Sequence, residues 1–152
     1  MSHCSSEAAE LARLIFTLPC HVKIPEKLRA NFERRGMVPS DEVESQQFPR
    51  MYCHGDERRA ALELRQTFPA LPRKSQWFGV QLADISRGGC RFLHVDPLYP
   101  GEQSRLVISS GTRTVIEILW CRRLGEQCFE VGAKFAQPLD PSTRLAQLFG
   151  TP

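Results

Sequence analysis

Six short runs with a period of two occupy the second half of the chain, and they constrain its fold more than any other feature. They begin at about Arg59, are rich in β-branched and aromatic residues, and are mostly separated by turn residues. Their sequences are ALEL, WFGVQLA, CRFLHV, SRLVIS, TVIEILWC and CFEVGAKF. Runs of this kind are typical of antiparallel strands. Because a closed sheet leaves no exposed edge, the pattern predicts a mainly β fold, a small six-stranded antiparallel barrel.

The register of the last two strands is predicted from their alternation. With residues 124–125 at the centre of the hairpin, Cys121 opposes Cys128 and Trp120 opposes Phe129. The face that then points to the core carries Ile116, Ile118, Trp120, Phe129, Val131, Ala133 and Phe135. The opposite face carries Glu130 and Lys134, so a slip of one residue would bury charge.

Two short helices are predicted before the strands. The first, Glu7–Leu18, has an apolar stripe at helical spacing, made of Leu11, Leu14, Ile15 and Leu18. In the second, PEKLRANFERRG, Pro25 suits the first helical position and Gly36 follows as a stop. Its shared apolar face is Leu28 and Phe32, and its last turn holds Arg34 and Arg35. Neither helix can bury its apolar face alone, so both pack on the barrel or on a partner.

The composition of the segments that flank the barrel predicts a linker before it and a helix after it. Residues Met37–Pro49 are polar and contain two prolines, which predicts a linker. At the other end, PLDPSTRLAQLF predicts a short C-terminal helix capped by Ser142. Its apolar residues, which would cover one end of the sheet, are Leu145, Leu148 and Phe149.

Composition excludes several classes of protein. Hydrophobic residues make up 41% of the chain and charged residues 24%, as in soluble globular proteins. No apolar run approaches the roughly 20 residues of a membrane span, and the N-terminus lacks the basic start of a signal peptide, so we expect a cytoplasmic protein. Twenty basic residues against 17 acidic ones give a net charge of +3. That balance argues against DNA or RNA as partner and is compatible with a small anionic ligand.

Neither a metal site nor catalysis is predicted. The six cysteines form no CxxC pair, so a structural zinc site has little support, and in a cytosolic protein they are expected to be reduced. No Gly-x-Ser-x-Gly motif is present, and the four histidines follow no catalytic pattern. We therefore expect no cofactor and no enzymatic activity.

The stretch ADISRGGCRF, residues 83–92, carries unusual polar chemistry for a turn between two strands. Asp84 can accept two hydrogen bonds side by side, which matches the N–H pair on the Watson–Crick edge of guanine, and Ser86 can donate to a phosphate or a base oxygen. Gly88 and Gly89 permit close approach of a ligand. The alternative is that Asp84 and Ser86 only make side-chain turns to their own backbone.

The pattern D-x-S-x-x-G, formed by Asp84, Ser86 and Gly89, resembles the signature of the PilZ domain family. Further resemblance lies in GEQSRLVIS, in the final hairpin ILWCRRLGEQCFEVGAKF with its G-x-x-F, and in the C-terminal helix. It covers roughly residues 46–150. The resemblance implies a PilZ domain over residues 46–152, preceded by a helical extension and linker over residues 1–45.

PilZ domains are bacterial receptors for cyclic di-GMP, so the resemblance implies a binding module. The family has a second motif, R-x-x-x-R, before the first strand, whose arginines hold the phosphates and stack on guanine. Here that place reads QQFPR, so Arg50 matches the second arginine, but Gln46 stands at the first. The only R-x-x-x-R in the chain, Arg87 to Arg91, overlaps the signature and is taken as fortuitous.

The resemblance thus implies a ligand site with the following residues: Gln46, Arg50, Asp84, Ser86, Gly88, Gly89 and Arg91. Arg91 is included because an arginine that lies near the ligand in space would compensate for the charge missing at Gln46. Other arginines considered for this role are Arg34, Arg35 and Arg58. A charge-assisted hydrogen bond contributes about 1.5–3 kcal/mol, so its loss weakens binding by roughly tenfold to more than a hundredfold.

Two functions are compatible with this sequence. In the first, the chain is a cyclic di-GMP receptor whose linker orders over the ligand and moves the N-terminal helices. In the second, a degenerate PilZ domain binds no nucleotide and instead holds a protein partner, or a second copy of itself, through those helices. Gln46 favours the second hypothesis, and the complete Asp84–Gly89 signature favours the first.

Overall fold

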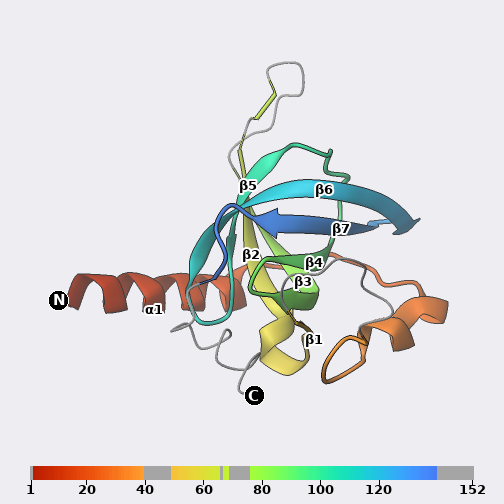
Figure 1. The fold of residues 1–152 in the computed structure, drawn as a ribbon, viewed down its shortest axis with the longest axis horizontal. Coiled ribbons are helices and arrows are strands. Elements are labelled where there is room, and N and C mark those ends of the chain that lie inside the picture. The colour runs from red at the N-terminus through yellow and green to blue at the C-terminus, as the bar shows by residue number, and fades with distance from the viewer. Residues whose placement is uncertain (1, 40–48, 66, 69–75, 140–152) are drawn as a thin grey trace.

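The structure of this chain, a computed structural model, describes residues 2–39, 49–65, 67–68 and 76–139. Its helices and strands follow one another as shown in Figure 1. They are α1 (Ser2–Thr17), η1 (Glu26–Phe32), β1 (Arg50–Tyr52), η3 (Gly55–Arg58), β2 (Arg59–Leu64), β3 (Gln76–Ser86), β4 (Gly89–His94), β5 (Gln103–Val107), β6 (Arg113–Gly125) and β7 (Cys128–Phe135).

Six of the strands close into an antiparallel barrel in the order β3-β2-β5-β6-β7-β4, with β4 pairing back on β3. The predicted six-stranded barrel is therefore confirmed. The seventh strand, β1, lies outside the barrel and pairs with the end of β3, where Arg50 opposes Ser86 and Tyr52 opposes Asp84. This strand was not predicted, because three residues are too short for a period of two to be recognised.

The inside of the barrel is filled by apolar side chains that alternate along the strands. The largest of them are almost completely buried: Leu62, Leu82, Ile85, Phe92, Leu106, Ile116 and Ile118. Because so small a barrel has no free space inside, any ligand site of this fold must lie on its outer surface.

The predicted register of the last hairpin is wrong. The turn lies at residues 126–127, so that Cys121 opposes Val131 and Trp120 opposes Gly132. A bulge between Ile118 and Trp120 shifts the alternation by one residue. As a result Trp120 lies on the outer face, where 41% of it is exposed, instead of in the core.

Most of the remaining predicted core face of this hairpin is confirmed, since Ile116, Ile118, Val131, Ala133 and Phe135 are buried. Phe129, also predicted to face the core, is only half-buried. Glu130 and Lys134 point the other way as predicted. Lys134 is exposed, but Glu130 is buried by neighbours on the outside of the barrel.

Helix α1 packs on the barrel with the predicted stripe. Ile15 is 2% exposed and contacts a cluster with Ala61 on β2 and Val107 on β5. Leu11 and Leu18 pack at the edge of the same cluster. In Figure 1 the N-terminal part of α1 continues beyond the barrel. Among the described residues no helix is both long and apolar enough to cross a membrane.

The second predicted helix is a 3-10 helix, η1, which ends at Phe32. Arg34 and Arg35 therefore lie beyond its end and not in its last turn. Phe32 is buried against the barrel with Ala83 and Cys128. The helical extension thus packs on the body of the same chain. Most of the predicted linker and the predicted C-terminal helix lie outside the described residues.

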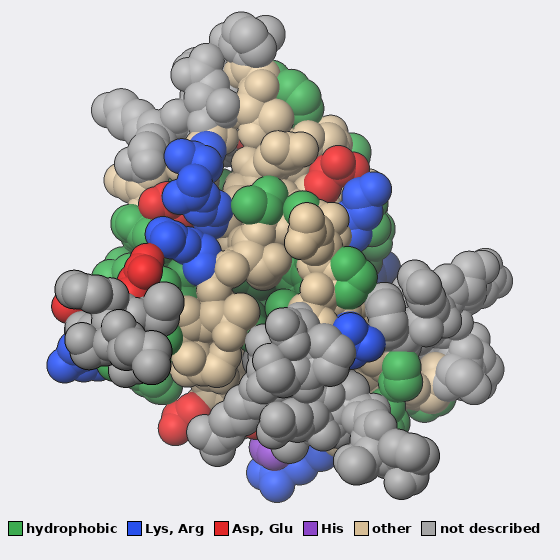
Figure 2. All heavy atoms as spheres, turned by 60° about the vertical axis from the view of Figure 1, so that its left-hand side comes forward, with side chains coloured by type: hydrophobic (Ala, Val, Ile, Leu, Met, Phe, Trp, Pro, Cys, Tyr) green, Lys and Arg blue, Asp and Glu red, His purple; other side chains and the backbone are tan. Residues whose placement is uncertain are grey.

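Charged side chains of both signs lie on the face shown in Figure 2, where several basic ones gather in a small group at the upper left and the others are scattered. This agrees with the small net charge of +3.

The packing of α1 leads to a prediction about stability. Ile15→Ala should lower the free energy of unfolding by about 2–5 kcal/mol, because it leaves a cavity between the helix and β2 and β5. Urea denaturation followed by circular dichroism measures this change. Glu10→Ala, at an exposed position of the same helix, is the control and should change stability by less than about 0.5 kcal/mol. Equal stability of both variants would show that α1 does not dock as described.

Candidate ligand-binding site

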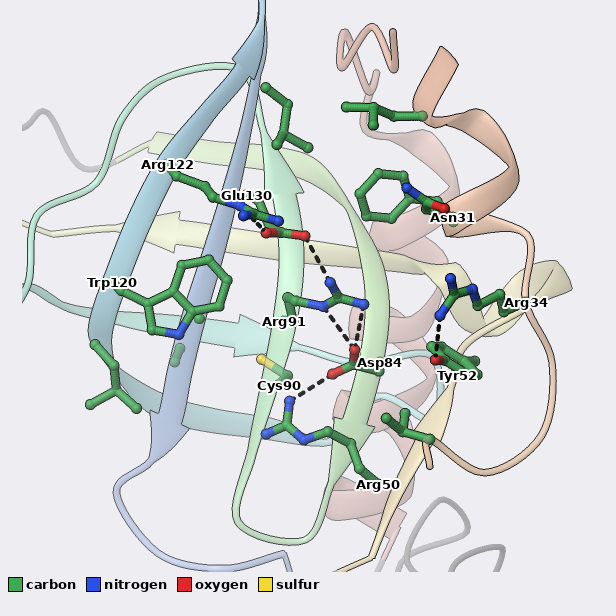
Figure 3. Close-up of a pocket in the computed structure, with 17 residues that line it drawn as sticks. Asn31, Arg34, Arg50, Tyr52, Asp84, Cys90, Arg91, Trp120, Arg122 and Glu130 are labelled. Atoms are coloured by element: carbon green, nitrogen blue, oxygen red, sulfur yellow. Dashed lines mark hydrogen bonds and ion pairs between the residues drawn. The ribbon is translucent and has the colours of Figure 1, made fainter. Parts of the chain in front are cut away.

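A pocket of about 660 Å³ lies on the outer side of the barrel, between β1, β3, β4, β6 and β7 and the segment around η1. Figure 3 shows its walls, with Trp120 and Arg122 on one side and Asn31 and Arg34 on the other. The full set of lining residues is Leu28, Asn31, Phe32, Arg34, Val38, Arg50, Tyr52, Asp84, Cys90, Arg91, Leu119, Trp120, Arg122, Leu124, Glu130, Gly132 and Ala133.

The carboxylate of Asp84 is the centre of the pocket floor. Asp84 is 3% exposed and both of its oxygens accept hydrogen bonds from arginines. Arg50 Nη1 donates to Oδ1 at 2.6 Å. Arg91 Nε donates to Oδ2 at 2.8 Å, and Arg91 Nη2 forms an ion pair with the same oxygen at 2.7 Å. Strand register explains this meeting, since β1 and β4 flank the end of β3 and Arg91 lies directly opposite Asp84.

A second buried carboxylate extends the cluster. Glu130 on β7 is 1% exposed. Its Oε2 accepts a hydrogen bond from Arg91 Nη1 at 2.8 Å, and its Oε1 accepts one from Arg122 Nε at 2.6 Å. Arg91 therefore bridges Asp84 and Glu130, and the five side chains form one continuous chain of ion pairs (Figure 3).

The charges that line the pocket do not cancel. Among the described lining residues, four arginines (Arg34, Arg50, Arg91 and Arg122) and two carboxylates (Asp84 and Glu130) give formal charges that sum to +2. In addition, Arg50 Nε is buried and has no hydrogen-bond partner among the described residues. A buried donor without a partner costs about 1–3 kcal/mol. The pocket therefore suits an anionic ligand with hydrogen-bond acceptors.

Ser86 behaves as the structural alternative predicts. Its Oγ accepts hydrogen bonds from the backbone N–H groups of Gly88 at 3.1 Å and Gly89 at 3.2 Å, and so holds the turn between β3 and β4. Gly89 opens β4 where its backbone approaches Ala133 so closely that a Cβ atom would overlap the carbonyl oxygen. Asp84 does not make such a turn, because its carboxylate accepts hydrogen bonds from Arg50 and Arg91 instead.

The predicted site residues are therefore only partly brought together. Arg50, Asp84 and Arg91 meet in the pocket, so Arg91 lines it although its R-x-x-x-R spacing was taken as fortuitous. The turn residues Ser86, Gly88 and Gly89 are not among the lining residues. Gln46 lies outside the described residues.

Trp120 is the main lining residue that the sequence analysis missed. Its indole lies over Gly132, where a Cβ atom would overlap the ring. A flat aromatic side chain that is partly exposed in a pocket is a surface on which a nucleobase stacks. The sequence signal was the pairing of Trp120 with Gly132, but it becomes visible only with the correct hairpin register. Arg122 and Glu130 were not predicted as site residues either, and Arg34 was named only as one of several arginines that compensate for Gln46 if they lie nearby.

Comparison with known proteins identifies the family of this chain. The sequence model of the PilZ domain matches residues 45–149, which is more than half of the chain. The chain belongs to the PilZ family. No curated protein matches it. One similar solved structure is that of the MrkH–c-di-GMP complex from K. pneumonia, with 14% sequence identity and a TM-score of 0.46. The match covers 62% of this chain but only 45% of that one.

The buried thiols of this PilZ domain have raised pKa values. Burial raises the pKa of Cys90, which lines the pocket, to about 12, and it also raises the pKa of Cys53. The five cysteines whose side chains are described form no disulfide. No group of three or more metal-binding side chains occurs within the described ranges.

These pKa values predict the pH dependence of thiol modification. A thiol with a pKa of about 12 is protonated throughout the physiological range, so Cys90 should react with an aromatic disulfide reagent only after unfolding. Cys20, which is exposed, should react in the native protein at pH 8. Stopped-flow measurements on Cys20→Ser and Cys90→Ser check this. The first variant should lose the reactivity of one thiol in the native state, and the second should react like the wild type. A loss in Cys90→Ser would show that the pocket thiol is accessible and ionised.

Proposed function

We propose that this chain is a cytoplasmic receptor for cyclic di-GMP that binds the ligand in the pocket beside β1 and has no catalytic activity and no cofactor. The observation that carries the proposal is the meeting of Arg50, Asp84 and Arg91 in one pocket of a PilZ domain. The resemblance of the Asp84–Gly89 signature to that of cyclic di-GMP receptors supplies the identity of the ligand.

The chemistry of the pocket fits this ligand. Cyclic di-GMP carries two phosphodiester groups and therefore two negative charges, which equals the excess of positive charge among the lining residues. Guanidinium groups pair with phosphate oxygens and with the O6/N7 edge of guanine in a bidentate geometry. The exposed face of Trp120 offers a surface for a guanine base, and base stacking on aromatic side chains contributes about 1–3 kcal/mol.

Binding requires an exchange of partners around Asp84. Both carboxylate oxygens are occupied by Arg50 and Arg91. A guanine that donates two N–H groups to Asp84 must displace at least one arginine, and the displaced guanidinium then turns to a phosphate of the same ligand. Because Arg50 leaves one ion pair and gains another, the exchange costs little electrostatic energy. Ser86, Gly88 and Gly89 shape the turn, and their predicted contacts with the ligand remain part of the proposal, as does that of Gln46.

Ligand binding changes the contacts of the N-terminal segment with the rest of the chain. Leu28, Phe32 and Val38 line the same pocket as Arg50. Arg50 also accepts a backbone hydrogen bond from Val38 at 2.9 Å. A ligand that draws Arg50 away from Asp84 therefore changes the surroundings of this segment. We infer that its contacts with a protein partner differ between the free and bound states.

A second function is favoured by one observation. Gln46 replaces the arginine that the PilZ family has at this position, which removes a charge-assisted contact with phosphate. In the alternative, the domain binds no nucleotide, and α1 and its surroundings hold a protein partner or a second copy of the chain.

Calorimetric titration with cyclic di-GMP separates the two functions. The wild-type chain should bind saturably, and Arg50→Ala should weaken binding by roughly tenfold to more than a hundredfold, because a charge-assisted hydrogen bond is lost. Arg65→Ala is the matched control, since Arg65 is exposed, pairs with Glu63 and does not line the pocket. Absence of heat and of thermal stabilisation with the wild-type chain would favour the protein-binding alternative.

Tryptophan fluorescence tests the stacking surface. The chain has two tryptophans, Trp77 and Trp120, so Trp77→Phe leaves Trp120 as the only indole. Cyclic di-GMP should quench its emission, because a stacked guanine replaces water at the exposed face. Trp120→Ala should weaken binding by about fivefold to a hundredfold, in line with the cost of losing one stacked base. Unchanged emission at saturating ligand would exclude Trp120 from the contact.

A further inference from the structure

The wall of the pocket that faces Trp120 comes from outside the PilZ domain match. The match begins at residue 45. Five lining residues precede it: Leu28, Asn31, Phe32, Arg34 and Val38. One of them, Arg34, carries a charge. Its side chain lies across the pocket from Trp120, with the Asp84 cluster between them (Figure 3).

The backbone on both sides of Arg34 is fixed to the barrel. Before it, Phe32 is 7% exposed and packs with Ala83 and Cys128. After it, the carbonyl oxygen of Gly36 accepts a hydrogen bond from the Tyr52 N–H at 2.9 Å. Gly36 has a φ of +84°, a conformation that favours glycine and turns the chain toward β1. Arg34 is therefore held at the pocket between two anchors.

The side chain of Arg34 is oriented by Tyr52. Arg34 Nη1 donates to the Tyr52 hydroxyl at 3.1 Å, and its guanidinium carbon lies 5.8 Å from the centre of the tyrosine ring. Tyr52 is the residue of β1 that lies directly opposite Asp84. A guanidinium has five N–H donors, so Arg34 can keep its bond to Tyr52 and also donate to a ligand.

The charge of the pocket depends on this residue. Arg50, Arg91 and Arg122 share the two carboxylates of Asp84 and Glu130, which leaves one excess positive charge in that cluster. One charge does not balance two phosphate groups. Arg34 adds a fourth arginine to the wall of the pocket, so the formal charges of the described lining residues sum to +2.

We propose that Arg34 binds a phosphate of the ligand and so supplies, from the N-terminal extension, the positive charge that Gln46 cannot supply. This inference rests on the proposed function. It makes the segment before residue 45 part of the binding site and not only a neighbour of it.

Calorimetry with cyclic di-GMP on the full chain tests the inference. Arg34→Gln, which removes the charge, should weaken binding about tenfold or more, since a charge-assisted contact is lost. Arg34→Lys keeps the charge and should retain more affinity than Arg34→Gln. Arg35→Gln is the matched control, because Arg35 is the neighbouring exposed arginine and does not line the pocket. It should bind like the wild type.

The outcomes separate this inference from the proposed function. If the wild-type chain binds and Arg34→Gln binds equally well, the assignment of Arg34 is overturned while the receptor function stands. Equal losses in Arg34→Gln and Arg35→Gln would also overturn it, since the effect would then reflect overall charge. If the wild-type chain shows no binding, the receptor function is overturned, and the role of Arg34 with it. Thermal unfolding of each variant verifies that the fold is retained.

Discussion

The burial of the Asp84 carboxylate is the interaction on which the arrangement around the pocket depends. Removing a carboxylate from water costs several kcal/mol unless cations and hydrogen bonds replace the solvent. Arg50 and Arg91 do so from the two strands that flank the end of β3. The ion pair with Arg50 helps to hold β1, a strand of only three residues, on the outside of the barrel. Since β1 in turn binds Gly36 and Val38 by backbone hydrogen bonds, the same carboxylate indirectly places the N-terminal wall of the pocket.

The barrel and the pocket draw on different parts of the sequence, and so they were predictable to different degrees. Alternating apolar residues identified all six barrel strands, because burial on one face imposes a period of two. The bulge after Ile118 adds no recognisable signal, and the predicted register therefore placed Trp120 in the core and paired Cys121 with Cys128. The signature residue Asp84 and the flanking Arg50 were identified by resemblance. Their direct ion pair depends on the register of β1, which the sequence does not show.

Arg34 illustrates a second limit of sequence reasoning. Its segment has the composition of an amphipathic helix, which predicts Arg34 in a last turn that stabilises the helix dipole. The chain instead forms a 3-10 helix that ends at Phe32, and this phenylalanine is buried against Ala83 and Cys128. The residues after it then run toward β1. Contacts with residues far away in the sequence decided the position of Arg34, and no local pattern could reveal them.

Stability alone gives little reason for a chain of ion pairs from Arg50 to Arg122. Replacing buried ion pairs by apolar side chains of similar volume is often neutral, or stabilising by about 1–4 kcal/mol. An apolar outer face between β4 and β7 would therefore hold the barrel together at least as well as Asp84, Arg91 and Glu130. What apolar residues could not provide is a cluster of arginines, a buried Arg50 donor without a partner among the described residues, and a carboxylate whose arginines can be exchanged. Each of these features is useful to a site that binds an anionic nucleotide, and that use explains the cluster better than the stability of the fold.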